Sequence, residues 1–99
     1  MSLTWNVILA ETAKKQLAKL AKKNPQQAQQ IIRYLKTLAT LENPRDRGKG
    51  LVGDLSGMWR YRVGDYRIIC HIDNGELLIT ALEIGHRREI IINQNRNAH

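Results

Sequence analysis

Two runs of strand-like residues, 59–63 and 66–73, are separated only by Gly64-Asp65. A two-residue loop joins antiparallel strands in a tight β-hairpin, and its length leaves no freedom in how the strands pair. The sequence therefore predicts a hairpin in which Val63 faces Tyr66 and each earlier residue of the first strand has an assigned partner.

The predicted register divides this hairpin into two chemically different faces, because side chains alternate between the faces of a strand. One face receives apolar and aromatic side chains: Trp59, Tyr61, Val63, Tyr66, Ile68, Cys70 and Ile72. The other face, which we name the arginine face, receives Arg60, Arg62, Arg67 and His71. Arg62 lies directly across from Arg67, and such a pair repels by roughly 0.2–1 kcal/mol. We therefore expect an anionic ligand on this face.

A second hairpin is predicted around Asn74-Gly75, a preferred pair for a type I′ turn. The strand that follows, residues 76–84, places Leu77, Ile79 and Ala81 on the core face. It places further side chains on the arginine face: Leu78, Thr80, Leu82 and Ile84. A strand that is apolar on both faces is typical of a central strand or of one covered by a partner. We expect a partner chain to contact Leu78, Leu82 and Ile84.

The first forty residues predict one strand and two helices. The strand has an apolar face formed by Leu3, Trp5, Val7 and Leu9. The first helix has an apolar stripe of Ala10, Ala13, Leu17, Leu20 and Ala21, with lysines mostly on its other side. Asn24 caps a second helix, with Pro25 in its first turn and Gln27 at the capping-box position. Its stripe contains Ala28, Ile31, Ile32, Leu35, Leu38 and Ala39, and Asn43-Pro44 ends it.

The element order is therefore β-α-α-β-β-β in a single α+β domain. We expect two layers, with a helical hairpin packed on one face of a mainly antiparallel twisted sheet and the arginine face left open. The domain is predicted to span residues 1–92. Residues 93–99 are polar and aperiodic, and are expected to form a disordered tail.

A glycine-rich basic loop, NPRDRGKGLVGDLSG, occupies residues 43–57. Its glycines would permit close approach of a phosphate backbone, and the alternative is that they serve turns. Arg45, Arg47 and Lys49 are its candidate substrate-binding residues. The P-loop pattern GxxxxGK[ST] does not occur.

Charge and cysteine content narrow the expected partners and compartment. Sixteen Lys and Arg against nine Asp and Glu give a formal net charge of +7, which favours nucleic acid, a ribosomal surface or an acidic protein as partner. A single cysteine, Cys70, fits a reducing compartment, and no apolar run is long enough for a membrane span, so we expect a cytoplasmic protein. The histidines and Cys70 lack metal-ligand spacing, so neither a metal site nor a cofactor is expected.

The combination of GDLSG, RVGDYRII and GHRR, in that order and within β-α-α-β-β-β, resembles the RelE/ParE superfamily of toxins from bacterial and archaeal type II toxin–antitoxin systems. The resemblance covers roughly residues 3–92. It implies either a RelE-type endoribonuclease that cuts messenger RNA in the ribosomal A site or a ParE-type poison of DNA gyrase. It also implies a cognate acidic antitoxin and a toxin–antitoxin hetero-oligomer.

The RelE branch is favoured, and the resemblance then assigns site residues by position. It implies that Arg60, Arg62, Arg67 and Arg87 serve the catalytic site, with Arg88 beside them as a substrate contact. Messenger RNA and ribosomal RNA are the implied partners, and the implied reaction is metal-free attack of a 2′-hydroxyl on the adjacent phosphate.

The sequence departs from the RelE pattern in two respects, so alternatives stay open. Arg60 and Arg62 stand where RelE-type members have lysines, and arginine is a poor general base. Residues 90–93 lack the aromatic residue that related toxins often carry there. His71, His86 and Glu89 are the candidates for proton transfer, and His71 is preferred because it lies on the arginine face. The alternatives are a gyrase poison without chemistry, or a catalytically degenerate homologue that retains antitoxin binding and operon repression.

Overall fold

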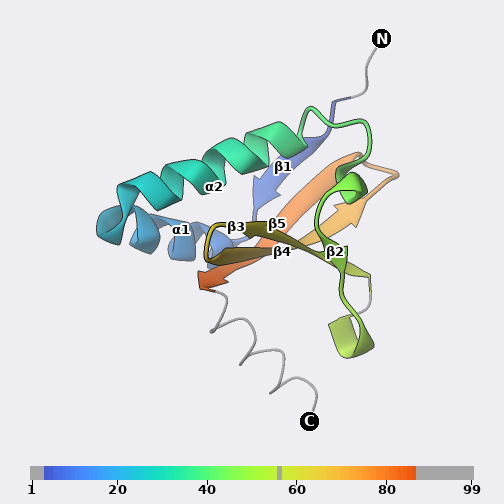
Figure 1. The fold of residues 1–99 in the computed structure, drawn as a ribbon. Coiled ribbons are helices and arrows are strands. Elements are labelled where there is room, and N and C mark those ends of the chain that lie inside the picture. Colours follow the sequence, from blue (N-terminus) through green and yellow to red (C-terminus); the bar gives the residue numbers. More distant parts are fainter. Residues whose placement is uncertain (1–3, 56, 87–99) are drawn as a thin grey trace.

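The computed structural model describes residues 4–55 and 57–86. Two helices cover one face of a five-stranded sheet, and the opposite face carries no helix of the described part of the chain (Figure 1). The helices and strands are β1 (Asn6–Leu9), α1 (Glu11–Lys23), α2 (Pro25–Leu38), β2 (Lys49–Gly50), β3 (Met58–Val63), β4 (Tyr66–Asp73) and β5 (Leu78–His86). The predicted α+β, two-layer architecture is confirmed. Short 3₁₀ turns at Pro44–Asp46 and Gly53–Leu55 flank β2.

The sheet has the order β1-β5-β4-β3-β2, in which only β1 and β5 run parallel. The prediction of a mainly antiparallel sheet is therefore confirmed. β5 lies between β1 and β4, so it is a central strand of the sheet. The strand β2 was not predicted, because its two residues carry no alternating pattern.

The β3–β4 hairpin has the predicted register at every position, from Val63 opposite Tyr66 to Met58 opposite His71. Gly64 has a φ of +60°, as the first central residue of a type II′ turn requires. The core face and the arginine face of this hairpin are therefore as expected.

The prediction of a two-residue type I′ turn at Asn74-Gly75 is wrong. Asp73 pairs with Leu78, so the loop contains four residues, and β5 begins at Leu78 rather than at residue 76. Asp73 Oδ1 accepts a hydrogen bond from the Glu76 amide at 3.2 Å, and Leu77 closes the loop with a φ of +50°. The two extra residues preserve side-chain parity, so Ile79 and Ala81 still face the core.

A β-bulge then changes the parity of β5. Cys70 pairs with Ala81 but Ile69 pairs with Glu83, so Leu82 is an extra residue in the ladder. Beyond the bulge, Ile84 is only 3% exposed and belongs to the hydrophobic core. The placement of Ile84 on the arginine face is therefore wrong, and Glu83 occupies that face instead.

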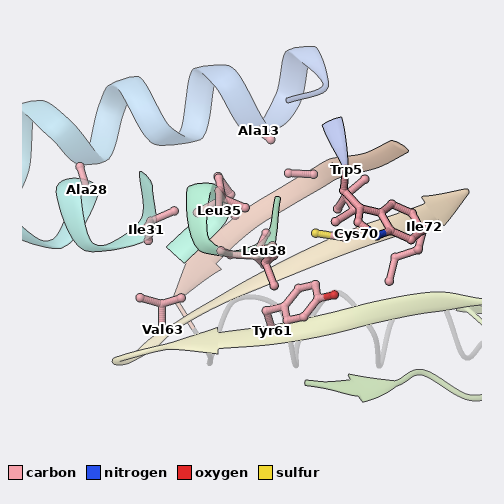
Figure 2. Packing of buried hydrophobic residues seen from close by; sticks show 14 of the residues in the cluster. Trp5, Ala13, Ala28, Ile31, Leu35, Leu38, Tyr61, Val63, Cys70 and Ile72 are labelled. Atoms are coloured by element: carbon pink, nitrogen blue, oxygen red, sulfur yellow. The ribbon is translucent and has the colours of Figure 1, made fainter. Parts of the chain in front are cut away.

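The core lies between the helices and the sheet (Figure 2). In Figure 2, Tyr61 and Val63 point from β3 toward the α2 residues Ile31 and Leu38. The stripe of α2 is buried at four positions: Ala28, Ile31, Leu35 and Leu38. Two residues that were predicted to lie in the apolar stripes are not buried: Ala21 is exposed and Ile32 is 37% exposed.

Asn24 caps α2 as predicted, since its Oδ1 accepts a hydrogen bond from the Gln27 amide at 3.2 Å. The second half of the capping box does not form. The Gln27 side chain instead donates to the carbonyl of Val63 at 3.4 Å, and so ties the start of α2 to the β3–β4 turn.

Candidate anion-binding site

The arginine face of the sheet contains a cavity of about 430 Å³, lined by Gly48, Lys49, Arg60, Arg62 and Arg67. Arg60 and Arg62 come from β3, Arg67 from β4, and Lys49 from β2. Four cationic side chains therefore share one open cavity, and no Asp or Glu is among its described lining residues. Such a cavity fits a phosphate group, because arginine donates charge-assisted, bidentate hydrogen bonds to phosphate oxygens.

Lys49 enters the site through the short strand β2. It pairs with Arg60, and directly opposed residues of antiparallel strands project their side chains to the same face. The sequence pattern had marked Lys49 as a substrate contact without placing it on the sheet. The structure brings it together with three of the predicted arginines.

Side chains from the core face hold the loop before β2 in place. The Tyr61 hydroxyl is fully buried and donates to the Pro44 carbonyl at 2.7 Å. Trp59 Nε1 donates to the Arg47 carbonyl at 2.6 Å. The predicted register placed both rings on the core face, and the structure confirms this. Their hydrogen bonds add a second role, because they fix the loop that presents Lys49.

Gly48 allows the loop to approach β3 closely. Its φ is +76°, and a Cβ atom at this position would overlap the carbonyl oxygen of Arg60. Residues with a side chain rarely adopt this conformation, so the glycine is required for β2 to pair beside Arg60.

Arg45 and Arg47 do not line the cavity. Arg45 Nη2 donates to the Ile72 carbonyl at 3.3 Å, near the C-terminal end of β4 and away from Arg67. The Arg47 side chain is hydrogen-bonded to Tyr34 of α2, which lies on the helix side of the sheet. Both residues therefore stabilise the loop in this structure and do not join the cluster of four cations.

His71 lies on the arginine face, as predicted, and is exposed. It pairs with Met58 and is a diagonal neighbour of Arg60 across β3 and β4, at a Cα separation of about 7–8 Å. His86 lies elsewhere: its ring makes an edge contact with Tyr66 at a centroid distance of 5.7 Å. Arg87, Arg88 and Glu89 lie outside the described residues, as does the predicted tail.

Glu83 is a residue of this face that the sequence reasoning missed. It lies opposite Ile69 because of the bulge at Leu82. A signal was available, since unbroken alternation from Ile79 would have placed the Glu83 carboxylate in the core. Burying an unpaired carboxylate is very costly, so a bulge before Glu83 is the expected solution.

Two further groups have pKa values that burial displaces. Desolvation raises the pKa of the Cys70 thiol to about 12, so the thiol stays protonated at neutral pH and is a poor nucleophile. Desolvation also raises the pKa of Tyr61, with smaller contributions from Cys70 and Tyr34. Tyr61 therefore acts as a neutral hydrogen-bond donor.

The predicted antitoxin contacts fall into two groups. Leu78 and Leu82 are partly exposed, and Leu78 projects onto the arginine face opposite Asp73. Ile84 is buried in the core and is not available to a partner. Within the part of the chain that the structure describes, no helix is long and apolar enough to cross a membrane, and no three His, Cys, Asp or Glu residues are grouped to hold a metal ion.

The fold and the cavity define a small basic α+β domain with an open cationic site that can accept a phosphate group. The chain matches, over residues 7–91, the family described as the ParE toxin of the type II toxin–antitoxin system parDE. The match covers most of the chain, so the protein belongs to this toxin family. The resemblance to the RelE/ParE superfamily is thereby confirmed.

Individual relatives are similar to the chain in sequence or in fold. Toxin RelE of Mycobacterium tuberculosis is 40% identical over 47 residues, which span 48% of this chain and 48% of that protein. The toxin–antitoxin complex RelBE2 of M. tuberculosis contains a chain with a TM-score of 0.75 and 26% identity, covering 88% of this chain and 95% of that chain. The archaeal RelE–RelB complex of Pyrococcus horikoshii contains a chain with a TM-score of 0.64 and 25% identity, covering 85% of this chain and 96% of that chain.

Proposed function

We propose that this toxin is a RelE-type endoribonuclease that binds messenger RNA in the ribosomal A site and cleaves it without a metal ion. The observation that carries the proposal is the cavity on the arginine face, where Lys49, Arg60, Arg62 and Arg67 converge. The similarity to toxin RelE supports the same branch. The proposed reaction takes place in the cytoplasm, on translating ribosomes.

The proposed chemistry begins with attack of a 2′-hydroxyl on the adjacent phosphorus, and it yields a 2′,3′-cyclic phosphate and a free 5′-hydroxyl. Arg60, Arg62 and Arg67 stabilise the anionic transition state, and Arg87 is proposed to join them. His71 is proposed as the general base that accepts the 2′-hydroxyl proton, because it lies on the arginine face and histidine is the side chain most often used for this step. Arg88 and ribosomal RNA are proposed as further contacts.

The arginines that line the cavity offer a direct test. Arg67→Ala should lower cleavage of ribosome-bound messenger RNA by about 10²–10³-fold, the loss typical of one transition-state donor. Primer extension on programmed ribosomes measures this, and circular dichroism checks the fold. Lys15→Ala is the matched control, because Lys15 is exposed on α1, which packs on the other face of the sheet. Full activity of Arg67→Ala, or activity of the wild type on naked RNA, would contradict the proposal.

An acidic antitoxin is proposed as the partner that silences the toxin. The similar structures from M. tuberculosis and P. horikoshii are toxin–antitoxin complexes, and the chain has a net charge of +7. Leu78 and Leu82 lie on β5, and Leu78 projects onto the arginine face that also holds the cavity. An antitoxin segment that extends from these residues across the arginine face would cover or displace the RNA site. Mixing toxin and antitoxin should give a stable hetero-oligomer that no longer cleaves RNA.

A ParE-type poison of DNA gyrase is the second candidate, and the family match favours it, because that family is described by ParE. This function would use the cationic face for binding and would need no proton transfer. Inhibition of DNA supercoiling by the wild type, with messenger RNA left intact, would select it.

A further inference from the structure

The cavity on the arginine face holds a candidate proton donor as well as phosphate-binding groups. We propose that Lys49 is the general acid of the reaction, donating a proton to the 5′ oxygen as it leaves the phosphate. The inference rests on the endoribonuclease function proposed above and assigns Lys49 a step beyond substrate binding.

The position of Lys49 suits this role. It faces Arg60 across the β2–β3 ladder, and both line the same cavity as Arg62 and Arg67. A phosphate held by the arginines would therefore lie beside the Lys49 ammonium group. The Arg62 Nε donates to the Gly64 carbonyl at 3.4 Å, which ties the Arg62 side chain to the β3–β4 turn.

Two hydrogen bonds from β3 side chains anchor the loop that carries Lys49. The hydroxyl of the fully buried Tyr61 donates a hydrogen bond to the Pro44 carbonyl, and the indole N–H of Trp59 donates one to the Arg47 carbonyl. Gly48, directly before Lys49, has the positive φ that brings the backbone onto Arg60. Such anchoring positions a reacting group within the narrow limits that proton transfer demands.

Among the residues that line the cavity, lysine is the residue type best able to give up a proton. Lysine ammonium groups are stronger acids than arginine guanidinium groups, which do not give up their proton in proteins. A protonated lysine is the dominant form at neutral pH, as a general acid requires.

Strand β3 also separates Lys49 from the proposed base, His71. In-line displacement places the attacking and leaving oxygens on opposite sides of phosphorus, so base and acid must flank the phosphate. Lys49 of β2 lies directly opposite Arg60 of β3, and His71 of β4 lies diagonally across from Arg60. Neighbouring strands are about 4.8 Å apart, so β2 and β4 are separated by about 10 Å, and the offset of His71 along β4 adds to that separation.

The step balances in atoms and charge. The 2′ oxygen forms a bond to phosphorus and loses its proton to the base, the bond between phosphorus and the 5′ oxygen breaks, and that oxygen takes a proton from Lys49 Nζ. The products are a 2′,3′-cyclic phosphate and a 5′-hydroxyl, and Lys49 regains its proton from water.

A substrate with sulfur in place of the bridging 5′ oxygen tests this role, because a thiolate leaves without protonation. On programmed ribosomes with ordinary messenger RNA, Lys49→Ala and Lys49→Arg should both slow single-turnover cleavage by about 10²–10⁴-fold, the contribution typical of a general acid. With the 5′-thio substrate, both variants should cleave within about tenfold of the wild type, as sulfur removes that same contribution. The Lys15→Ala control should match the wild type on both substrates.

Two results would overturn the assignment. Equal slowing of Lys49→Ala on both substrates would show that Lys49 only binds phosphate, and so would full activity of Lys49→Arg on ordinary RNA. Failure of the wild type to cleave either substrate would instead overturn the proposed function, and with it the role of Lys49. Lys49 is exposed, so both variants are expected to keep the wild-type melting temperature.

Discussion

Tyr61→Phe tests whether the buried hydroxyl of β3 holds the loop that completes the site. Tyr61 is fully buried, and its hydroxyl donates to the carbonyl of Pro44, which is also buried, at 2.7 Å. Phenylalanine keeps the ring and its packing but removes the donor. The Pro44 carbonyl then stays buried and loses this hydrogen bond.

The expected loss of stability follows from that carbonyl. Leaving a buried acceptor without its donor costs about 1–3 kcal/mol. In a domain of this size each kcal/mol lowers the melting temperature by about 4–8 °C, so a loss of about 2 kcal/mol corresponds to about 8–16 °C. The loop should also loosen, which would displace Lys49 and reduce RNA cleavage.

Thermal unfolding followed by circular dichroism measures the first effect, and cleavage on programmed ribosomes measures the second. Tyr34→Phe is the matched control: its ring packs against Tyr61 at a centroid distance of 5.7 Å, but its hydroxyl meets the exposed Arg47, where water can replace it. We expect the control to lose less than about 1 kcal/mol, the net worth of an ordinary hydrogen bond. Equal melting temperatures for Tyr61→Phe and the wild type would refute the reasoning.

Three further predictions concern the backbone, the thiol and the partner surface. Gly48→Ala should lower the denaturant midpoint more than Gly53→Ala. Both glycines have a positive φ, which strains an alanine by about 1–3 kcal/mol, but only the Cβ at residue 48 would also overlap the carbonyl of Arg60. Equal midpoints would count against the close pairing of β2 with β3. Burial raises the pKa of Cys70 from 9.0 to about 12, so the stabilisation from the protonated thiol is complete below about pH 9 and is lost as the pH rises toward about 12. The free energy of unfolding should fall by up to about 1.4 kcal/mol per pH unit in this range. In urea unfolding, Cys70→Ala should show a smaller fall in stability between these pH values than the wild type. Leu82→Arg should speed antitoxin dissociation in surface plasmon resonance, and unchanged dissociation would move the proposed interface elsewhere.

The sequence predicted those parts of the fold in which local chemistry and tertiary packing agree. The two-residue loop Gly64-Asp65 leaves one register for β3 and β4, and alternation then separates arginines from core residues without further information. Asn24 likewise begins α2 because its side chain satisfies an amide of the first turn. These features depend on residues close together in the chain.

The errors arose where a second structural requirement overrides a simple local pattern. The loop after β4 has four residues because Asp73 caps it from within the strand, although Asn74-Gly75 favours a tighter turn. The bulge at Leu82 follows from the need to keep the Glu83 carboxylate out of the core and to bury Ile84. Neither preference can be read from alternation alone.

The candidate site was predicted in part for the same reason. The arginines of the hairpin followed from register, whereas Arg45, Arg47 and Lys49 came from one loop and could not be told apart by sequence. Only the structure separates them, because the hydrogen bonds of Tyr61 and Trp59 hold the loop so that Lys49 lines the cavity and the two loop arginines do not.

The chemistry at the ends of the cleaved RNA tests the central proposal most directly. Purified toxin is mixed with programmed ribosomes, and the fragments are analysed by mass spectrometry, with gyrase supercoiling assayed in parallel. The account predicts fragments ending in a 2′,3′-cyclic phosphate and beginning with a 5′-hydroxyl, with cleavage retained at EDTA levels that leave the ribosome assembled and with normal supercoiling. Fragments with a 3′-hydroxyl and a 5′-phosphate, or intact messenger RNA together with inhibited supercoiling, would contradict it.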